Sequence, residues 1–169
     1  MSQVEKHKIK LLERDSKRNY VILEMDGEKV RIDKISNEKR KKWIELDKKG
    51  SVKRISISAG LIDFGTHDKK VFGLYRLLWY FGVPHGISDW NQYTCFFELK
   101  YKDFTFVLDD ARDHLRINSE HDVPRDKYAE YSKPEKKAEL APPEEIKNEF
   151  RSLIDFLVKY PIEREVFPL

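Results

Sequence analysis

Two acidic residues and a lysine are spaced so that they share one face of a predicted β-hairpin. Glu98 and Lys100 lie two residues apart in the segment 93–101, Asp109 ends the next segment, and Asp89 precedes the pair. Because successive side chains of a strand point to opposite faces, Glu98 and Lys100 point to the same side. Carboxylates and an ammonium group gathered in this way could hold a divalent metal ion beside a water molecule.

A helix, then an Asp, then a strand with the pattern Glu-x-Lys resembles the core of the PD-(D/E)xK nuclease family, over about residues 69–109. The resemblance implies that Asp89 and Glu98 bind Mg²⁺ and that Lys100 positions or activates a water molecule. Oxygen ligands suit Mg²⁺, which would polarise a phosphate and generate hydroxide for phosphodiester cleavage. The pattern of an acid, any residue and Lys recurs elsewhere in this chain. A solvent-facing Glu98 and Lys100 therefore remain the alternative.

The basic residues are concentrated in the N-terminal third of the chain. Residues 1–58 contain 17 Lys and Arg against 10 Asp and Glu, whereas residues 59–169 contain 16 against 20. Such a basic surface favours an acidic partner, either nucleic acid or protein, and a lysine-rich solvated surface is the alternative. The residues expected to bind the partner are Lys29, Arg31, Lys39, Arg40, Lys41 and Lys42. We therefore expect a non-enzymatic binding or accessory protein, with a metal-dependent nuclease as the alternative.

No other motif indicates a cofactor or a reaction. The five histidines have no zinc-like spacing, and the chain has no glycine-rich phosphate loop or Gly-x-Ser-x-Gly sequence. Cys95 is the only cysteine, so it cannot form an intramolecular disulfide, and a reducing cytoplasmic location is expected. The longest apolar stretch, 71–83, is shorter than the roughly 20 residues that a membrane helix needs. Apart from Mg²⁺ in the nuclease alternative, we expect no cofactor.

Two hairpins are predicted to position these residues. Asp26-Gly27 separates the alternating segments 20–25 and 28–33, and such a pair favours a type I′ turn. Lys102-Asp103 separates 93–101 from 104–109 in the same way. Further strands are expected near 7–12 and over 51–58. In the first hairpin one face is apolar and the other charged, as expected of a sheet that covers a core.

The helices complete an α+β fold. Capping residues and strong helix formers predict a surface helix over 37–48, which carries the basic cluster. The segment 69–82 is apolar nearly all round and is expected to be a buried central helix, on which the hairpins pack through Leu74, Leu77, Leu78 and Phe81.

The C-terminal third is predicted to be a tether followed by a helix. Residues 118–143 are charged and contain four prolines, which is typical of a linker. Residues 144–160 have an amphipathic stripe that should dock on the core, or else on a partner. The expected organisation is therefore a core over 1–117, the linker, and the C-terminal helix, all within a single domain.

Overall fold

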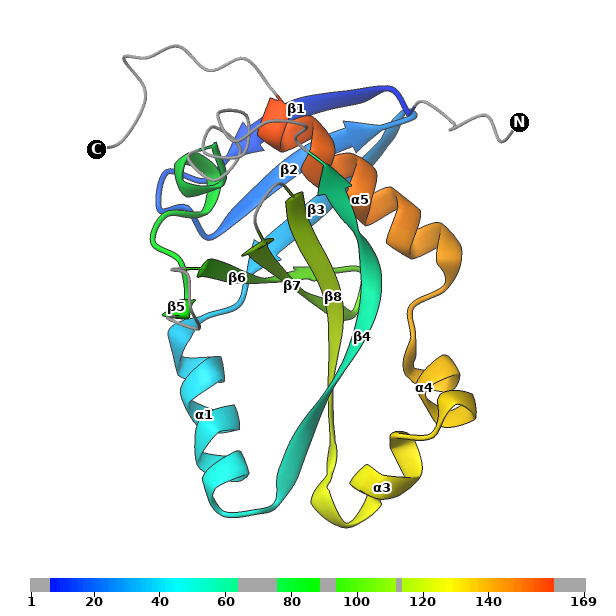
Figure 1. Ribbon diagram of the computed structural model, residues 1–169. Coiled ribbons are helices and arrows are strands. Elements are labelled where there is room, and N and C mark those ends of the chain that lie inside the picture. Colours follow the sequence, from blue (N-terminus) through cyan, green and yellow to red (C-terminus); the bar gives the residue numbers. More distant parts are fainter. Residues whose placement is uncertain (1–6, 64–75, 89–93, 112–113, 160–169) are drawn as a thin grey trace.

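The computed structural model describes residues 7–63, 76–88, 94–111 and 114–159 of the chain. Within these ranges eight strands form one antiparallel sheet, in the order β1-β2-β3-β6-β7-β8-β4, with β5 paired to β6 (Figure 1). The strands are β1 (Ile9–Arg14), β2 (Tyr20–Met25), β3 (Glu28–Lys34), β4 (Val52–Asp63), β5 (Gly86–Ser88), β6 (Thr94–Tyr101), β7 (Phe104–Ala111) and β8 (His114–Pro124). The predicted α+β character is confirmed.

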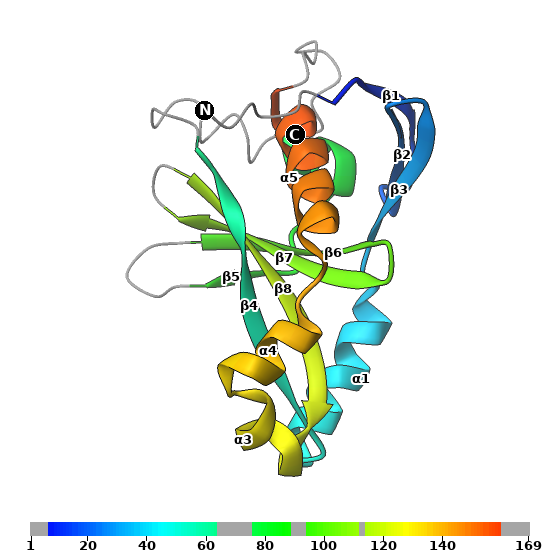
Figure 2. The same ribbon diagram turned by 90° about the vertical axis from the view of Figure 1, so that its right-hand side faces the viewer.

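The helices lie on both sides of this sheet. They are α1 (Asn37–Lys48), α3 (Tyr128–Tyr131), α4 (Pro134–Leu140) and α5 (Glu144–Lys159), with a 3-10 turn over Arg125–Lys127. The sheet bends around α5, which lies between β1–β3 and the upper part of β4 (Figure 2). The long strands β4 and β8 extend downward between α1 on one side and α3 and α4 on the other (Figure 1).

Both predicted hairpins form in the predicted register. Leu23 pairs with Val30 across the first, and Leu99 pairs with Phe106 across the second. The turn residues Asp26, Gly27, Lys102 and Asp103 all have positive φ, as a type I′ turn requires. The helix predicted over 37–48 is also confirmed, and it begins where the Ser36 side chain accepts a hydrogen bond from the Lys39 N–H.

One hydrophobic core unites the sheet with α5 and with the helical residues 76–81. The α5 stripe is buried there, and the rings of Phe150 and Phe106 stack with centroids 4.1 Å apart. Leu77 and Phe81 are fully buried, Leu78 is half-buried, and Leu74 lies outside the described residues. Because the first half of 69–82 is outside them too, packing of the hairpins on one central helix stays a prediction.

Two boundaries differ from the sequence prediction. β4 continues to Asp63 instead of ending at 58, because a bulge near Gly60 lets the strand bend and carry on. Gly60 has φ +112°, a left-handed conformation that favours glycine, and a Cβ there would also lie 2.8 Å from the Arg151 Nε of α5.

The predicted linker begins inside β8, which is a correction. Residues 118–124 pair with β4, and 118–120 also pair with β7, while much of 125–140 forms short helical elements. The strand alternates, but Ser119 and His121 stand between Ile117 and Val123 and hydrogen-bond to each other. These two polar residues interrupt the apolar pattern that would have revealed the strand.

Candidate functional site

The second hairpin brings the predicted acids and lysine to one face of the sheet. Glu98 and Lys100 of β6 lie opposite Val107 and Thr105 of β7, and Asp109 lies on the same face one step further along. This is the face that α1 covers in part, and we call it the open face because α5 packs on the other. Asp89 lies outside the described residues. The structure therefore places three of the four predicted residues on one surface.

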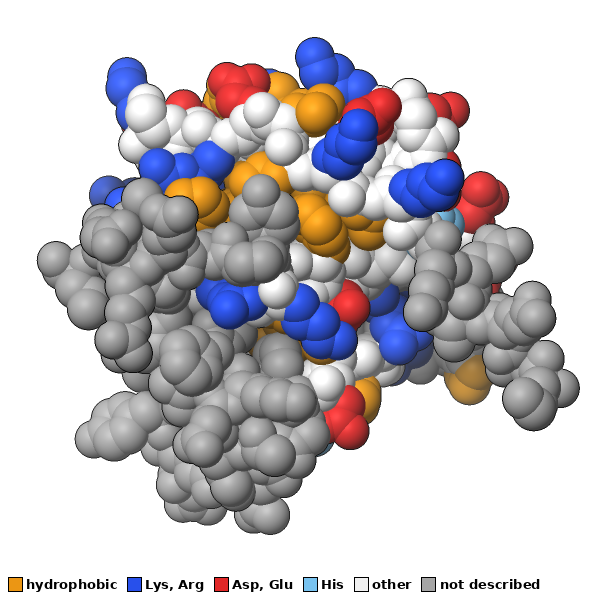
Figure 3. Space-filling model, turned by 90° about the horizontal axis from the view of Figure 1, so that it is seen from above, with side chains coloured by type: hydrophobic (Ala, Val, Ile, Leu, Met, Phe, Trp, Pro, Cys, Tyr) orange, Lys and Arg blue, Asp and Glu red, His pale blue; other side chains and the backbone are white. Residues whose placement is uncertain are grey.

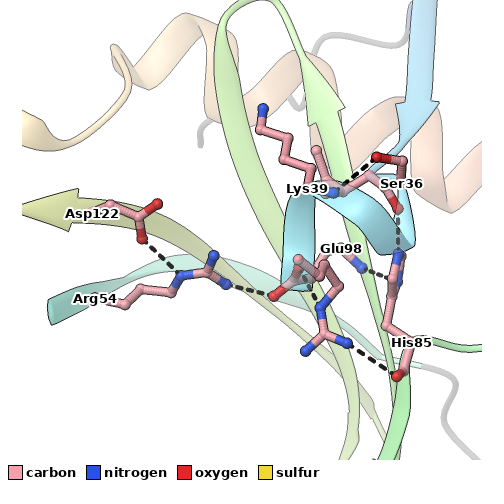
Figure 4. Close-up of polar contacts among 8 residues, drawn as sticks. Ser36, Lys39, Arg54, His85, Glu98 and Asp122 are labelled. Atoms are coloured by element: carbon pink, nitrogen blue, oxygen red, sulfur yellow. Dashed lines mark hydrogen bonds and ion pairs between the residues drawn. The ribbon is translucent and has the colours of Figure 1, made fainter. Parts of the chain in front are cut away.

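Glu98 is the most buried charged residue of the open face, with 3% of its surface exposed. Its carboxylate accepts a hydrogen bond from the Arg40 Nε of α1 at 2.8 Å and another from the Arg54 Nη1 of β4 (Figure 4). Each carboxylate oxygen therefore faces a guanidinium group. Ion pairs of this kind are strong when both partners are largely withdrawn from water and hydrogen-bonded.

The two arginines are themselves held by other groups. Arg54 donates to Asp122 at 3.1 Å and lies over the Trp43 ring with 4.0 Å to the centroid. Arg40 donates to the His85 carbonyl at 3.1 Å. The cluster of Arg40, Arg54 and Glu98 thus connects α1 and β4, which are neighbours in the sequence, to the distant strands β6 and β8. We call it the Glu98 cluster.

His85 extends this network on the side of β6. One ring nitrogen, Nδ1, accepts the backbone N–H of Glu98 at 2.8 Å, and the other, Nε2, lies 2.7 Å from the Ile35 carbonyl. The ring must therefore carry its proton on Nε2. Burial lowers the pKa of His85, which favours this neutral form.

Two of the predicted acids, Glu98 and Asp109, are engaged in ion pairs. Besides the Glu98 carboxylate, Asp109 binds Arg116 of β8 at 2.8 Å, and Lys100 stands opposite Asp33 of β3. Among the residues that the structure describes, no three His, Cys, Asp or Glu side chains are grouped so that they could hold a metal ion. The nuclease alternative would therefore require Glu98 to release both arginines.

A pocket of about 460 Å³ lies between α1 and the open face. Trp43, Phe104 and Leu140 contribute apolar walls, and Arg54 and Glu120 contribute charge. Burial raises the pKa of Glu120 to about 7, and a hydrogen bond from Ser56 and the charge of Arg54 oppose this rise. Glu120 is therefore the ionisable group of this pocket whose charge changes near neutral pH.

The basic cluster predicted on α1 divides into different environments. Lys39 and Lys42 line the pocket and are exposed, whereas Arg40 turns inward to Glu98. Lys41 is exposed and does not line the pocket. None of the three lysines forms an ion pair with a described residue, which leaves their charge available to a partner.

A second depression, of about 310 Å³, lies where β3 separates from β6. Its basic residues are the predicted Lys29 and Arg31 together with Lys100 and Lys102, and its acids are Asp33 and Asp103. Arg31 pairs with Asp33 at 2.9 Å and lies over the Tyr20 ring at 3.9 Å, and Lys102 binds Glu149 of α5 at 2.8 Å. Lys29 and Lys100 form no ion pair with any described residue. We call Lys29, Arg31, Lys39, Lys42, Lys100 and Lys102 the basic face.

Sequence reasoning gave Lys100 the role of positioning a water molecule and did not consider Lys102. Both join the basic face because β3 pairs with β6 at Asp33–Lys100 and Lys34–Leu99, about 65 residues apart in the sequence. No local pattern signals that contact. Only the exposed positions of both lysines, at the end of the second hairpin, could have suggested it.

Charges of both signs are interspersed on the surface. Viewed from above, Lys and Arg side chains alternate with Asp and Glu around hydrophobic ones (Figure 3). Among the described residues, no helix has the length and apolar character that crossing a membrane requires. No protein-family model, curated protein or solved structure matches this chain, so its function has to be inferred from this geometry.

Proposed function

We propose that the chain is a non-enzymatic binding protein whose basic face contacts an acidic segment of a partner protein. The observation that carries the proposal is the gathering of Lys29, Lys39, Lys42 and Lys100 beside two neighbouring depressions, without ion pairs to described residues. Asp103 lines both depressions, so the two are neighbours. Unpaired lysines on a concave surface attract carboxylates and accelerate association.

The interspersed acids favour a protein partner over a nucleic acid. Asp33, Asp103 and Asp122 would repel a continuous phosphate backbone but can lie between separate carboxylate side chains. The two rings that could have stacked on bases are each covered on one face by a guanidinium group, Trp43 by Arg54 and Tyr20 by Arg31. At most the opposite face of each ring is left for stacking on a base.

The proposal is tested by binding of labelled polyglutamate, measured by fluorescence anisotropy at increasing salt. We expect binding that weakens as salt screens the charges. Replacing Lys29 and Lys100 together with Glu should weaken it by about tenfold or more, since each exchange turns an attraction into a repulsion. The melting temperature should fall only slightly. Neither lysine forms an ion pair with a described residue, but each new Glu would face an acid across the sheet, Glu24 or Asp33.

The matched control replaces Lys127 and Lys133 with Glu, which changes the net charge equally at two exposed lysines outside the basic face. This variant should bind nearly as well as the wild type. Equal losses in the two variants would show that only net charge matters, and the proposal would fail. Tighter binding of single-stranded DNA than of polyglutamate would instead favour a nucleic-acid partner.

An assay for catalytic turnover distinguishes the nuclease alternative from the binding proposal. The nuclease alternative expects Mg²⁺- or Mn²⁺-dependent cleavage of DNA or RNA that is lost in Glu98→Gln, whereas the binding proposal expects no cleavage in either protein. Lys100→Ala distinguishes the two as well, because it should abolish cleavage in one case and weaken only polyglutamate binding in the other.

A further inference from the structure

One edge of β3 is left without a neighbouring strand. β3 pairs with β2 along Glu28–Asp33, but its other edge meets β6 only at Asp33 and Lys34. β6 ends at Tyr101, where the Lys102-Asp103 turn leads the chain away into β7. Among the described residues, no strand lies beside β3 between Glu28 and Ile32.

The register shows which backbone groups this edge presents. A two-residue turn makes Met25 and Glu28 a hydrogen-bonded pair, so Lys29 and Arg31 are non-hydrogen-bonded positions relative to β2. Their N–H and C=O groups therefore point away from β2. Further along the same edge, the Ile35 N–H donates to the Glu98 carbonyl of β6 at 3.0 Å, as this alternation requires.

There is space beside this edge for another strand. The depression of about 310 Å³ is lined by Lys29, Val30 and Arg31 on one side and by Lys100 and Lys102 on the other. A neighbouring strand would run about 4.8 Å from β3. Its side chains on the open face would lie near these cations, and those on the opposite face would lie beside Val30, which is buried.

We propose that the edge of β3 between Glu28 and Ile32 binds an extended acidic segment of a partner protein as an added β-strand. The inference rests on the proposed function and specifies how the partner is held. Backbone hydrogen bonds to Lys29 and Arg31 provide the pairing, and carboxylates at alternate positions face the lysines. The residues between those acids are apolar, because they lie on the side of Val30.

The charges also argue against a second copy of this chain as the occupant. Pairing two copies of the edge would bring Lys29 and Arg31 of one copy against the same residues of the other. Like charges opposite each other destabilise a strand pair, and lysines on an edge strand prevent self-association. An acidic segment instead meets Lys29, Lys100 and Lys102, and its carboxylates can lie between Asp33 and Asp103.

The first test is amide hydrogen exchange of the full chain, measured by NMR with and without a short peptide that alternates Glu and Val. In the free protein the Lys29 and Arg31 amides should exchange fast, and the peptide should slow both by at least about tenfold. The Val30 and Ile32 amides, which point to β2, are the internal control and should change little. Unchanged exchange at Lys29 and Arg31 under saturating peptide would overturn the inference.

The second test compares Arg31→Pro with Arg31→Gln. Both remove the charge, but only proline removes the outward N–H, and it leaves the β2–β3 hydrogen bonds intact. We expect Arg31→Pro to bind the Glu-Val peptide at least about tenfold more weakly than Arg31→Gln. A peptide N-methylated at every second residue should also lose binding, since it cannot pair with a strand edge.

The outcomes separate this inference from the proposed function. If Arg31→Pro binds as Arg31→Gln does, while Lys29→Glu with Lys100→Glu still weakens polyglutamate binding, the added strand is wrong and the basic face stands. If neither the peptide nor polyglutamate binds the wild type, both are wrong. Protection of the Lys29 and Arg31 amides together with the proline effect supports both.

Discussion

At the scale of single residues, the position of Glu98 bears on two interpretations of the same motif. The sequence offers a carboxylate and a lysine on one strand face, and this pattern fits a metal site or a charged surface equally well. The structure adds Arg40 from α1 and Arg54 from β4, which precede Glu98 in the sequence by 58 and 44 residues. Through its ion pair with Arg40, the Glu98 carboxylate therefore holds α1 on the sheet.

Removing that carboxylate should destabilise the protein. In Glu98→Gln two arginines, each with 18% of the side chain exposed, lose their shared counter-charge. We expect the free energy of unfolding in urea to fall by about 3 kcal/mol. The control is Asp109→Asn, which breaks an ion pair with the half-exposed Arg116 and should cost less than about 1 kcal/mol. Equal costs would show that burial adds nothing to the Glu98 cluster.

Glu120 should make stability depend on pH in the neutral range. Burial raises its pKa from 4.5 to about 7 in the folded protein, so the folded state prefers the protonated form. The stabilising effect of protonation is complete below pH 4.5 and is lost as the pH rises to about 7. Glu120→Gln should therefore unfold like the wild type at pH 4 and be more stable by about 1 kcal/mol at pH 8.

Two histidines change the stability with pH in the direction opposite to Glu120. The variant is therefore compared with the wild type through the difference in their free energies of unfolding at each pH. Burial lowers the pKa of His85 and of His121 below 6.5, and their contribution to stability is lost as the pH falls below that value. Both histidines are also present in Glu120→Gln, so their contributions to the free energy of unfolding cancel in this difference. Glu130→Gln changes an exposed acid, and its difference in free energy of unfolding from the wild type should not depend on pH. A flat difference for Glu120→Gln as well would refute the role of Glu120.

At the scale of elements, the helices and strands that could be predicted were those whose sequence signals lie within the element itself. The two hairpins, helix α1 and helix α5 were predicted closely because their turns, caps and periodicities lie within the elements. The pairing of β3 with β6 and of β4 with β8 joins distant segments and has no local signal. The candidate site depends on these distant contacts. For that reason the sequence named Glu98, Lys29 and Arg31 but not their arrangement.

Among the helices, the contribution to stability should follow burial. Leu77, in the helical residues 76–81, is fully buried, whereas Leu46 of α1 is 43% exposed. Leu77→Ala should lower the free energy of unfolding by about 2–5 kcal/mol, because it leaves a cavity in the core. Leu46→Ala should lower it by less than about 1 kcal/mol. A loss under about 1 kcal/mol at Leu77 would show that residues 76–81 are not essential to the core.

At the scale of the whole molecule, the continuous sheet predicts a single unfolding transition. β8 joins β4 to β7, β6 joins β7 to β3, and the Glu98 cluster attaches α1 to the sheet. Variants that keep only Trp43 of α1 or only Trp79 should therefore show the same urea midpoint by fluorescence, coincident with circular dichroism. A lower midpoint for Trp43 would show that α1 detaches before the sheet unfolds.

The pairing of β4 with β8 also has a consequence for synthesis on the ribosome. Of the residue pairs between these two strands, Asp63 and His114 are the nearest in the sequence, and they are 51 residues apart. At about 5–20 residues per second, β4 is complete some 3–10 s before its partner begins to emerge. During that interval Ile55, Ile57 and Ile62 belong to a strand with no neighbour on either side. The growing chain is thus most exposed to mispairing with other nascent chains in this interval, well before the C-terminal helix is made.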